Sequence, residues 1–306
     1  MIYDTIIIGA GPAGLTASIY ASRYRLSNLV IGKLPGGTIT YAHKVENFPG
    51  FISVSGLELA QKMIEQAKTY GIKILTENVG KIERSKGEIF KLTAETGKEF
   101  LAKTLIVATG TERRKLNVPG EKEYSGKGVS YCTTCDAPFF KNKIVVLIGG
   151  SNAACSGAIH LAEFAEKVYL IYRKGELRAE PVWVEEVKQN HRITVIYNTN
   201  VSEILGDGTK VTAVRLDTPY QASNELSTDG VFIEIGGVPA SSFLIPLGVV
   251  LDEDGYVKVN EKMETNIGGL FAAGDLTTRA KILQQLVIAC ADGAIAAFSV
   301  FSYLKR

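Results

Sequence analysis

The sequence predicts an α/β protein with two Rossmann-like nucleotide-binding folds. The order of strand, glycine-rich turn, helix and strand occurs at the start of the chain and again near its middle, and each occurrence indicates a βαβ unit. The length of 306 residues allows about two domains, each able to bury a core. With 46% hydrophobic and 22% charged residues, the composition is ordinary for a globular protein, so disorder is not expected.

The first βαβ unit opens the chain. Apolar and β-branched residues predict strands over 5–8 and 29–31, with a helix between them. The turn reads Gly9-x-Gly11-x-x-Gly14, in which the first glycine permits a tight turn, the second lets the backbone approach a pyrophosphate, and the third lets helix and strand pack closely. The helix N-terminus would face the phosphates. This context favours dinucleotide binding over a merely structural turn.

One usual partner of this loop is absent. The residue after the second strand is Gly32, where an acid that binds a ribose hydroxyl is expected. FAD remains a suitable ligand because other segments can hold its adenosine half.

The second βαβ unit is predicted from strands over 144–148 and 168–171. Its loop, Gly149-x-Ser151-x-x-Ala154, places a side chain where a pyrophosphate needs bare backbone, although a serine hydroxyl can donate to phosphate. The loop therefore indicates either a nicotinamide nucleotide site or a degenerate, purely structural nucleotide fold.

Three cations follow the second of these strands. Arg173, Lys174 and Arg178 occur where the 2′-phosphate of NADPH would lie. The alternative is a solvated basic edge.

The remaining segments complete the two folds. A buried strand is predicted over 104–108, a polar linker over 113–119 with a domain boundary near residue 115, and a hairpin over 249–259. The final segment, from 270 through a long helix ending at about 304, has no nucleotide loop of its own. We expect it to complete the first domain.

Charge and hydropathy exclude several classes of protein. The chain has 34 Lys plus Arg and 32 Asp plus Glu, a net charge of +2, so nucleic-acid binding is not expected. No apolar run approaches the roughly 18 residues of a membrane span, and the N-terminus lacks a basic region before an apolar stretch. We therefore expect no membrane association and a cytoplasmic location.

Two cysteines have a spacing suited to redox chemistry. In Cys132-Thr133-Thr134-Cys135-Asp136 the thiols are within disulfide reach on one turn. Beside a flavin, such a pair can take two electrons and pass them to a partner disulfide by exchange. Asp136 would donate or accept the proton; alternatively, it caps the following turn.

A zinc site at these cysteines is not expected. Tetrahedral zinc needs two further ligands, but the other cysteines are single and the histidines show no paired spacing, so no metal is predicted. The residues considered are Cys155, Cys290, His43, His160 and His191.

The motifs together resemble the low-molecular-weight thioredoxin reductases over essentially the whole chain. The family's motifs occur in the family's order, at 9–14, 36–38, 45–50, 108–110, 132–136 and 272–275. By this resemblance, the FAD-binding residues are Gly9, Gly11, Pro12, Ala13, Gly14, Gly36, Gly37, Thr38, Asn47, Gly110, Gly274, Asp275 and Gln285. The corresponding NADPH-binding residues are Gly149, Ser151, Asn152, Ala153, Arg173, Lys174 and Arg178.

The resemblance also implies the domain organisation and the roles of the thiols. It implies three-layer β/β/α domains with parallel sheets: an FAD domain from 1–115 plus 244–306, and an inserted pyridine-nucleotide domain, 116–243, that carries the cysteines. The crossings near 115 and 244 would act as hinges.

The same resemblance implies the roles of the site residues: Cys135 would face the flavin, Cys132 would attack the partner disulfide, and Asp136 would be the acid. The implied partner is a thioredoxin or glutaredoxin-like protein, and the implied assembly is a homodimer.

Departures from the family pattern concentrate on the nicotinamide side. Ser151 replaces a glycine, Ser156 and Gly157 replace two glutamates, and Tyr172 replaces a histidine. On the flavin side, Thr38 and Gln284 differ from the usual residues. Some relatives take electrons from ferredoxin or another donor, so ferredoxin or a reduced flavin is the alternative to NADPH. A third hypothesis is a non-catalytic flavin redox sensor, which the retained Asp136 disfavours.

Overall fold

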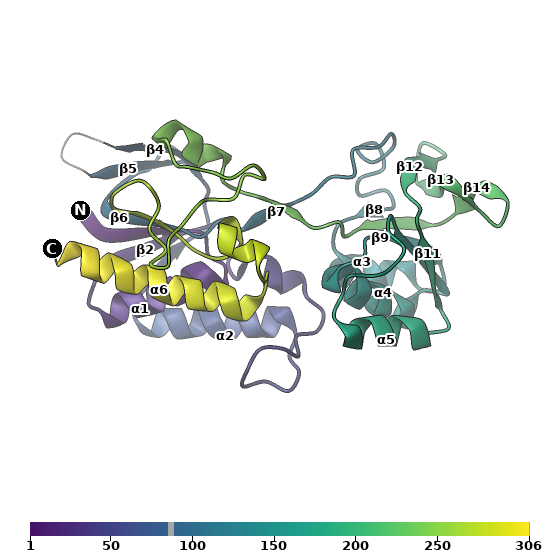
Figure 1. The fold of residues 1–306 in the computed structure, drawn as a ribbon, viewed down its shortest axis with the longest axis horizontal. Helices are drawn as coiled ribbons and strands as arrows, with labels where there is room; N and C mark the ends of the chain where they lie inside the picture. Colours follow the sequence, from purple (N-terminus) through teal and green to yellow (C-terminus); the bar gives the residue numbers. More distant parts are fainter. Residues whose placement is uncertain (85–88, 306) are drawn as a thin grey trace. The chain divides into compact units, whose positions relative to one another are not determined.

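The computed structural model describes residues 1–84 and 89–305, and its chain forms two units (Figure 1). Unit 1 comprises Met1–Thr40, Val45–Glu112 and Val238–Arg306, and unit 2 comprises Tyr41–Lys44 and Arg113–Gly237. Unit 1 is thus built from both ends of the chain. The short segment Tyr41–Lys44 packs as part of unit 2, although its neighbours in sequence on both sides belong to unit 1.

Unit 1 is built on a seven-stranded sheet of order β3-β2-β1-β6-β5-β4, with β17 paired to β6. The strands β1, β2, β3, β6 and β17 pair in parallel, and β4, β5 and β6 pair antiparallel. Ile6, Ile7 and Ile8 of β1 are all buried, as expected for a strand covered on both faces. The strands are β1 (Ile2–Ile8), β2 (Asn28–Ile31), β3 (Lys73–Leu75), β4 (Val79–Arg84), β5 (Phe90–Ala94), β6 (Glu99–Val107) and β17 (Leu270–Ala272).

Helices α1 and α6 lie alongside one another on unit 1 (Figure 1). They share one apolar core in which Leu15 of α1 and Val300 of α6 are fully buried together with Ile7 of the sheet. The predicted C-terminal helix is confirmed, ending at Leu304. The helical segments of unit 1 are α1 (Pro12–Arg23), η1 (Gly37–Tyr41), α2 (Gly56–Thr69), η3 (Ser242–Leu247), η4 (Gly274–Leu276), η5 (Thr278–Lys281) and α6 (Leu286–Leu304).

Helix α6 is also long and apolar enough to cross a membrane, judged by length and composition alone. This is weak evidence, because a core helix of a globular unit passes the same test. Ala289, Ala296 and Ala297 of α6 are buried in the core of unit 1, so packing within the unit accounts for part of its apolar character.

Unit 2 contains a parallel sheet of order β11-β10-β9-β15-β8 and an antiparallel sheet of order β12-β13-β14. Apolar residues fill both faces of the parallel sheet: Val145 and Leu147 of β9 face the core with α4, and Val146 and Ile148 face the antiparallel sheet. The result is the predicted β/β/α layering. Its strands are β8 (Val129–Ser130), β9 (Ile144–Ile148), β10 (Lys167–Tyr172), β11 (Ile193–Tyr197), β12 (Val201–Gly206), β13 (Val211–Tyr220), β14 (Ser223–Ser227) and β15 (Gly230–Ile233).

The helices of unit 2 are α3 (Thr133–Asp136), η2 (Ala137–Phe140), α4 (Asn152–Phe164) and α5 (Pro181–Gln189). The two segments that carry the chain between the units, β7 (Thr111–Arg113) and β16 (Gly237–Pro239), pair as a two-stranded sheet.

One predicted element is shorter in the structure than expected. The hairpin expected over 249–259 reduces to an isolated antiparallel bridge between Leu251 and Val257, closed by a turn in which Asp252 N–H donates to the carbonyl of Tyr256. Val257 also bridges Thr277 in parallel, so this segment follows the C-terminal part of unit 1 instead of extending a ribbon.

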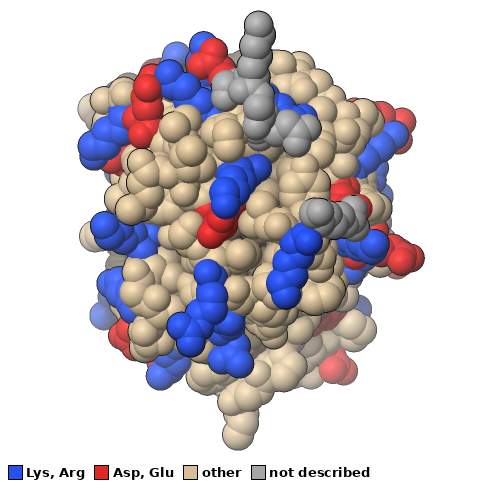
Figure 2. All heavy atoms as spheres, turned by 90° about the vertical axis from the view of Figure 1, so that its left-hand side faces the viewer, with Lys and Arg blue, Asp and Glu red and all other residues tan. Residues whose placement is uncertain are grey.

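The surface of the protein carries both signs of charge. Figure 2 shows lysine, arginine, aspartate and glutamate side chains interspersed over one face, as expected from a net charge of +2.

Candidate functional site

The glycines of the first loop occur for different structural reasons. Gly9 has φ +114°, and an added Cβ would lie 2.1 Å from the carbonyl oxygen of Ala108. A Cβ on Gly14 would lie 1.9 Å from the carbonyl oxygen of Gly9. At Gly11, by contrast, the nearest described atom would be the Cα of Gly37, at 3.6 Å. Packing therefore requires Gly9 and Gly14, whereas Gly11 leaves bare backbone at the start of α1.

A second glycine segment packs against this loop. The N–H of Gly36 donates to the carbonyl of Ala10 at 2.8 Å, and a Cβ on Gly37 would lie 2.8 Å from the Cα of Gly11. Gly32 is equally confined, because its Cβ would lie 2.5 Å from the nitrogen of Ala10. This contact explains why no acid occupies the position after β2.

The other residues expected to bind FAD also lie in unit 1. The carboxyl ends of β1, β6 and β17 are adjacent, since Ile8 pairs with Val107 and Val107 pairs with Ala272. Segments that follow these strands therefore meet at one edge of the sheet, where ligands of doubly wound folds bind. The expected residues outside the first loop are Gly36, Gly37, Thr38, Asn47, Gly110, Gly274, Asp275 and Gln285.

Two polar contacts support this edge of unit 1. The amide of Gln284 donates to Asp275 Oδ2 at 3.1 Å, and the amide nitrogen of Asn47 donates to Gln285 Oε1 at 3.1 Å. Burial raises the pKa of the Asp275 carboxyl, and the hydrogen bond from Gln284 opposes that rise. Bare backbone, a helix N-terminus and a half-buried carboxyl together fit the pyrophosphate and polyol parts of a dinucleotide such as FAD.

The redox pair lies on the short helix α3 of unit 2. Cys132 and Cys135 form a disulfide with a Cα–Cα distance of 5.3 Å, and the Cys135 N–H donates to Cys132 Sγ at 3.2 Å. Cys135 is exposed and Cys132 is half-buried. Ser130 holds the entry to the helix, because its hydroxyl accepts from the N–H of Cys132 at 3.0 Å. The pair is therefore closed, ordered and reachable from solvent within its unit.

Asp136 follows the second cysteine and is half-buried. Its side chain makes no capping hydrogen bond to the following turn, η2, among the described residues. Turn capping therefore does not explain why a carboxyl is present here. The role of Asp136 as a proton donor stays a prediction.

The packing of α3 on α4 explains one departure from the family pattern. A Cβ on Gly157 would lie 3.0 Å from Cγ2 of the buried Thr133. The glycine therefore allows α4 to approach the helix that bears the cysteines.

The glycines of the second nucleotide loop are also closely packed. A Cβ on Gly149 would lie 2.3 Å from the carbonyl oxygen of Glu234, and a Cβ on Gly150 would lie 2.5 Å from the ring of Tyr172. Ser151 precedes α4 and makes no side-chain capping bond within the described chain, so its hydroxyl is available to a ligand.

The predicted cations border this loop. Arg173, Lys174 and Arg178 are all exposed in the segment between β10 and α5, and the backbone N–H of Arg178 donates to the carbonyl of Gly150 at 2.9 Å. A carboxylate is present as well: Asn152 donates to Glu180 Oε1 at 3.0 Å, and the Glu180 N–H donates back to Asn152 Oδ1 at 2.7 Å.

Glu234 has an environment that the sequence did not indicate. Burial raises the pKa of this carboxyl from its ordinary value of 4.5 to about 7, and nearby Arg113, 3.3 Å away, opposes the rise. Glu234 directly follows the buried strand β15, and an isolated acid after an apolar strand gives no signal by itself.

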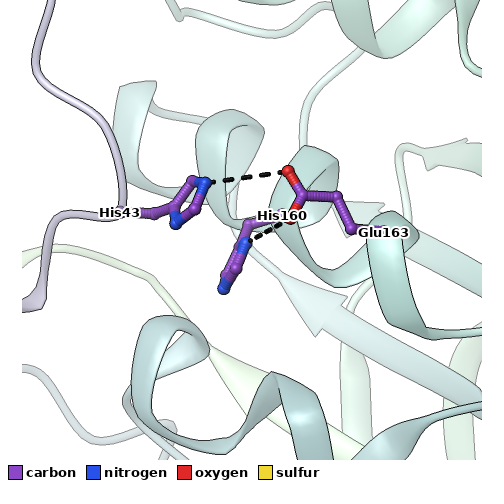
Figure 3. Close-up of side chains that lie close together, drawn as sticks. All are labelled: His43, His160 and Glu163. Atoms are coloured by element: carbon purple, nitrogen blue, oxygen red, sulfur yellow. Dashed lines mark hydrogen bonds and ion pairs between the residues drawn. The ribbon is translucent and has the colours of Figure 1, made fainter. Parts of the chain in front are cut away.

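The structure also brings together two histidines that sequence spacing left unrelated. The rings of His43 and His160 stack with centroids 3.7 Å apart and an interplanar angle of 17°, and both rings lie beside Glu163 (Figure 3). Burial, followed by the charge of His43, lowers the pKa of His160. Sequence analysis missed this cluster because 116 positions separate His160 from His43.

The two-unit fold of this chain is similar to the folds of known proteins. Residues 3–293 match the family of pyridine nucleotide-disulphide oxidoreductases. The chain is 43% identical to the thioredoxin reductase of Bacillus subtilis over 100% of this chain and 96% of the relative. It is similar to the crystal structure of Lactococcus lactis thioredoxin reductase, described as the FR conformation, with a TM-score of 0.94, 35% identity and 99% of each chain covered.

The chain is also similar to a solved structure with a different description. A protein from Clostridium acetobutylicum described as a ferredoxin-flavin thioredoxin reductase is 36% identical, with a TM-score of 0.54, and covers 99% of this chain and 98% of its own.

Proposed function

The chain belongs to the thioredoxin reductases within the pyridine nucleotide-disulphide oxidoreductase family, and on that premise we propose that it passes electrons from NADPH, through FAD and the Cys132–Cys135 pair, to a thioredoxin-like protein disulfide. The observation that carries the proposal is the closed disulfide in unit 2, in which Cys135 is exposed and is followed directly by Asp136. Unit 1 supplies a backbone cradle that fits FAD.

When bound, FAD would supply the two electrons that reduce the disulfide. With two protons, these electrons reduce the Cys132–Cys135 disulfide to two thiols. The Cys132 thiolate then attacks one sulfur of the partner disulfide, which breaks that bond and leaves a mixed disulfide. Attack by Cys135 on the Cys132 sulfur releases the partner as a dithiol and restores the intramolecular disulfide. Asp136 would supply the proton for the departing thiolate.

The flavin would be held by the first loop and the segments that meet it. The N–H groups at the start of α1, exposed by Gly11 and Gly37, would bind the pyrophosphate. The carboxyl of Asp275 would accept a hydrogen bond from a hydroxyl of the linking chain.

NADPH would be held by the second loop and its cations. The Ser151 hydroxyl would donate to the pyrophosphate, and Arg173, Lys174 and Arg178 would bind the 2′-phosphate. The backbone bond between Arg178 and Gly150 supports this placement because it brings the cationic segment to the loop.

A different electron donor is the second candidate function. The carboxylate of Glu180, bonded to Asn152 at the loop, would repel a pyrophosphate, and the Tyr172 ring covers Gly150. Both observations favour ferredoxin or a reduced flavin in place of NADPH. The third hypothesis, a redox sensor without turnover, is the least supported because Cys135 is exposed and Asp136 directly follows it.

Exposed aromatic residues suggest where other chains bind. Phe139, three positions after the redox pair's carboxyl, is 74% exposed and offers an apolar contact for the partner thioredoxin. On unit 1, Tyr20 and Phe298 are exposed beside Tyr24, whose ring lies near both, and this face would pair with a second copy to form a homodimer.

Free thiols and dithiol chemistry suit a reducing compartment such as the cytoplasm.

The donor is tested by anaerobic stopped-flow titration of the purified flavoprotein with NADPH and with NADH, following flavin absorbance. We expect rapid bleaching by NADPH and slower bleaching by NADH. Arg178→Ala should slow the NADPH reaction toward the NADH rate and leave the NADH rate unchanged, while Lys210→Ala, elsewhere on unit 2, should change neither. Absence of bleaching by either nucleotide, with prompt reduction by dithionite and reoxidation by a disulfide, would instead identify another donor.

The dithiol is tested with Cys135→Ser. We expect disulfide reduction to fall to background while FAD remains bound, because unit 1 holds the flavin independently of the cysteine. Cys290→Ser, a substitution of a thiol outside the pair, is the control and should retain turnover. If Cys135→Ser turned over at the wild-type rate, both the site assignment and the enzyme hypothesis would be wrong.

A further inference from the structure

We propose that His43, His160 and Glu163 form a binding site for a divalent transition-metal ion, with Zn²⁺ as the best-suited ion. The three side chains lie within unit 2, and the proposal does not depend on the electron route described above. It replaces the expectation, drawn from sequence spacing, that the histidines are unrelated and that the chain holds no metal.

The ligand atoms already converge. Nε2 of His43 lies 3.6 Å from Oε1 of Glu163, and Nδ1 of His160 lies 3.1 Å from Oε2 of the same carboxylate (Figure 3). One ligand atom from each residue lies within 4.8 Å of the other two. A ring nitrogen binds a metal in the plane of its ring, and the two rings are stacked nearly parallel, so an ion at about 2.0–2.2 Å from each atom requires one imidazole to turn out of the stack.

The donor set selects the kind of ion. Two imidazole nitrogens and one carboxylate oxygen form a set that zinc sites use, whereas calcium and magnesium prefer oxygen ligands. Glu163 and His43 are half-exposed at their side chains, at 51% and 41%, so water can reach the cluster and complete a fourth position.

The backbone positions two of the ligands together. His160 and Glu163 are three residues apart on α4, which places their side chains on one face of the helix. His160 is buried, and its ring is confined between the face of His43 and the edge of Phe164, whose centroid lies 5.3 Å away.

The third ligand is held by separate contacts. His43 belongs to Tyr41–Lys44, the short segment that packs with unit 2. The Thr134 hydroxyl donates to the carbonyl of Tyr41 at 2.7 Å, and the guanidinium of Arg113 lies 4.8 Å from the centre of the Tyr41 ring. Because these contacts fix the segment without any ion, its backbone is in place before binding and only side chains have to turn, which reduces the ordering cost of capturing a metal.

The experiment is a Zn²⁺ titration of the oxidised holoprotein in competition with a chromophoric chelator, with metal content measured after dialysis. The Cys132–Cys135 disulfide stays closed under these conditions, so its thiols do not compete for the ion. We expect one Zn²⁺ per chain in the wild type. Both His43→Ala and Glu163→Gln should weaken Zn²⁺ binding by at least about tenfold. Loss of a residue that only hydrogen-bonds to a metal ligand commonly has an effect of this size, and a direct ligand should matter at least as much.

The controls separate a site from general binding. His191→Ala removes the exposed third histidine of unit 2 and should leave the affinity unchanged. His43 and Glu163 are exposed, so their variants should fold, which flavin absorbance and thermal unfolding would verify; His160→Ala is a buried change and is only supplementary. Equal affinity in all variants, no Zn²⁺ bound at micromolar concentration, or displacement of Zn²⁺ by equimolar Ca²⁺ would each overturn the proposal.

Discussion

Individual glycines of the first loop perform different tasks, and this difference can be tested. Gly11→Ala adds a methyl group 3.6 Å from the Cα of Gly37, an ordinary contact, so the protein should fold. The methyl group would lie where a pyrophosphate approaches the backbone, and we expect FAD affinity to fall at least about tenfold. Gly9→Ala should instead destabilise unit 1, because its methyl group would lie 2.1 Å from the carbonyl oxygen of Ala108.

Flavin content after dialysis and the unfolding midpoint distinguish the two variants. The expected pattern is a stable, flavin-poor Gly11→Ala protein and an unstable Gly9→Ala protein. A Gly11→Ala variant that keeps full flavin affinity would remove Gly11 from the binding surface.

Glu234 should make the stability of unit 2 depend on pH. Its folded pKa, about 7, lies above the ordinary value of 4.5, so the folded state binds more protons between these values. The stabilisation from the protonated carboxyl is therefore fully present below about pH 4.5 and is lost as pH rises through about 7. Glu234→Gln has no charge to bury, and we expect it to exceed the wild type in stability at about pH 8, by on the order of 1–3 kcal/mol.

Fluorescence of Trp183, the single tryptophan of the chain, reports unfolding of unit 2 because it lies on α5. The advantage of Glu234→Gln should shrink strongly at about pH 5. Glu176→Gln, at an exposed position, is the matched control and should follow the wild type at both pH values. An equal effect of Glu234→Gln at both pH values would contradict the raised pKa.

At the scale of elements, the contact between α1 and α6 holds the first loop in place. A Cβ on Gly293 of α6 would lie 2.1 Å from the carbonyl oxygen of Ala13, a backbone atom that cannot rotate away. Gly293→Ala should separate the helices at a cost of about 1–3 kcal/mol and loosen FAD, because α1 begins at the loop.

Thermal unfolding and flavin release on heating measure both effects of Gly293→Ala. Ala291→Ser, on the exposed side of α6, should leave the midpoint and the flavin unchanged. If Gly293→Ala matched the wild type, the close approach of the two helices would not be needed for the fold.

At the scale of the whole molecule, the aromatic face of unit 1 predicts self-association. Tyr24 stacks on Phe301 at 4.7 Å and lies near Phe298, which is 54% exposed. We expect sedimentation analysis to give the mass of a dimer. Phe298→Asp should lower the measured mass to that of the monomer, because burial of the new carboxylate in the interface would remove its hydration. Phe139→Asp, which changes an exposed phenylalanine on unit 2, should remain dimeric. A wild-type monomer at micromolar concentration would refute the proposed assembly.

Local pattern accounts for the parts of the molecule that were predicted correctly. The strand, turn and helix around Gly9–Gly14 and around Gly149–Ala154, the final helix ending at Leu304, and the disulfide between Cys132 and Cys135 all depend on residues within a few positions of one another. Periodicity, turn chemistry and cysteine spacing describe such short-range relations directly.

Long-range packing decided the remainder. Only the folded chain places His43 beside His160, buries Glu234, closes the space at Gly32 and turns the hairpin expected near residue 255 into a single bridge. These features arise from contacts between segments far apart in sequence, and such contacts leave no periodic trace in either segment. Local pattern thus specifies the two nucleotide folds and the redox pair, whereas long-range packing sets which side chains meet, because burial and proximity are properties of the folded chain.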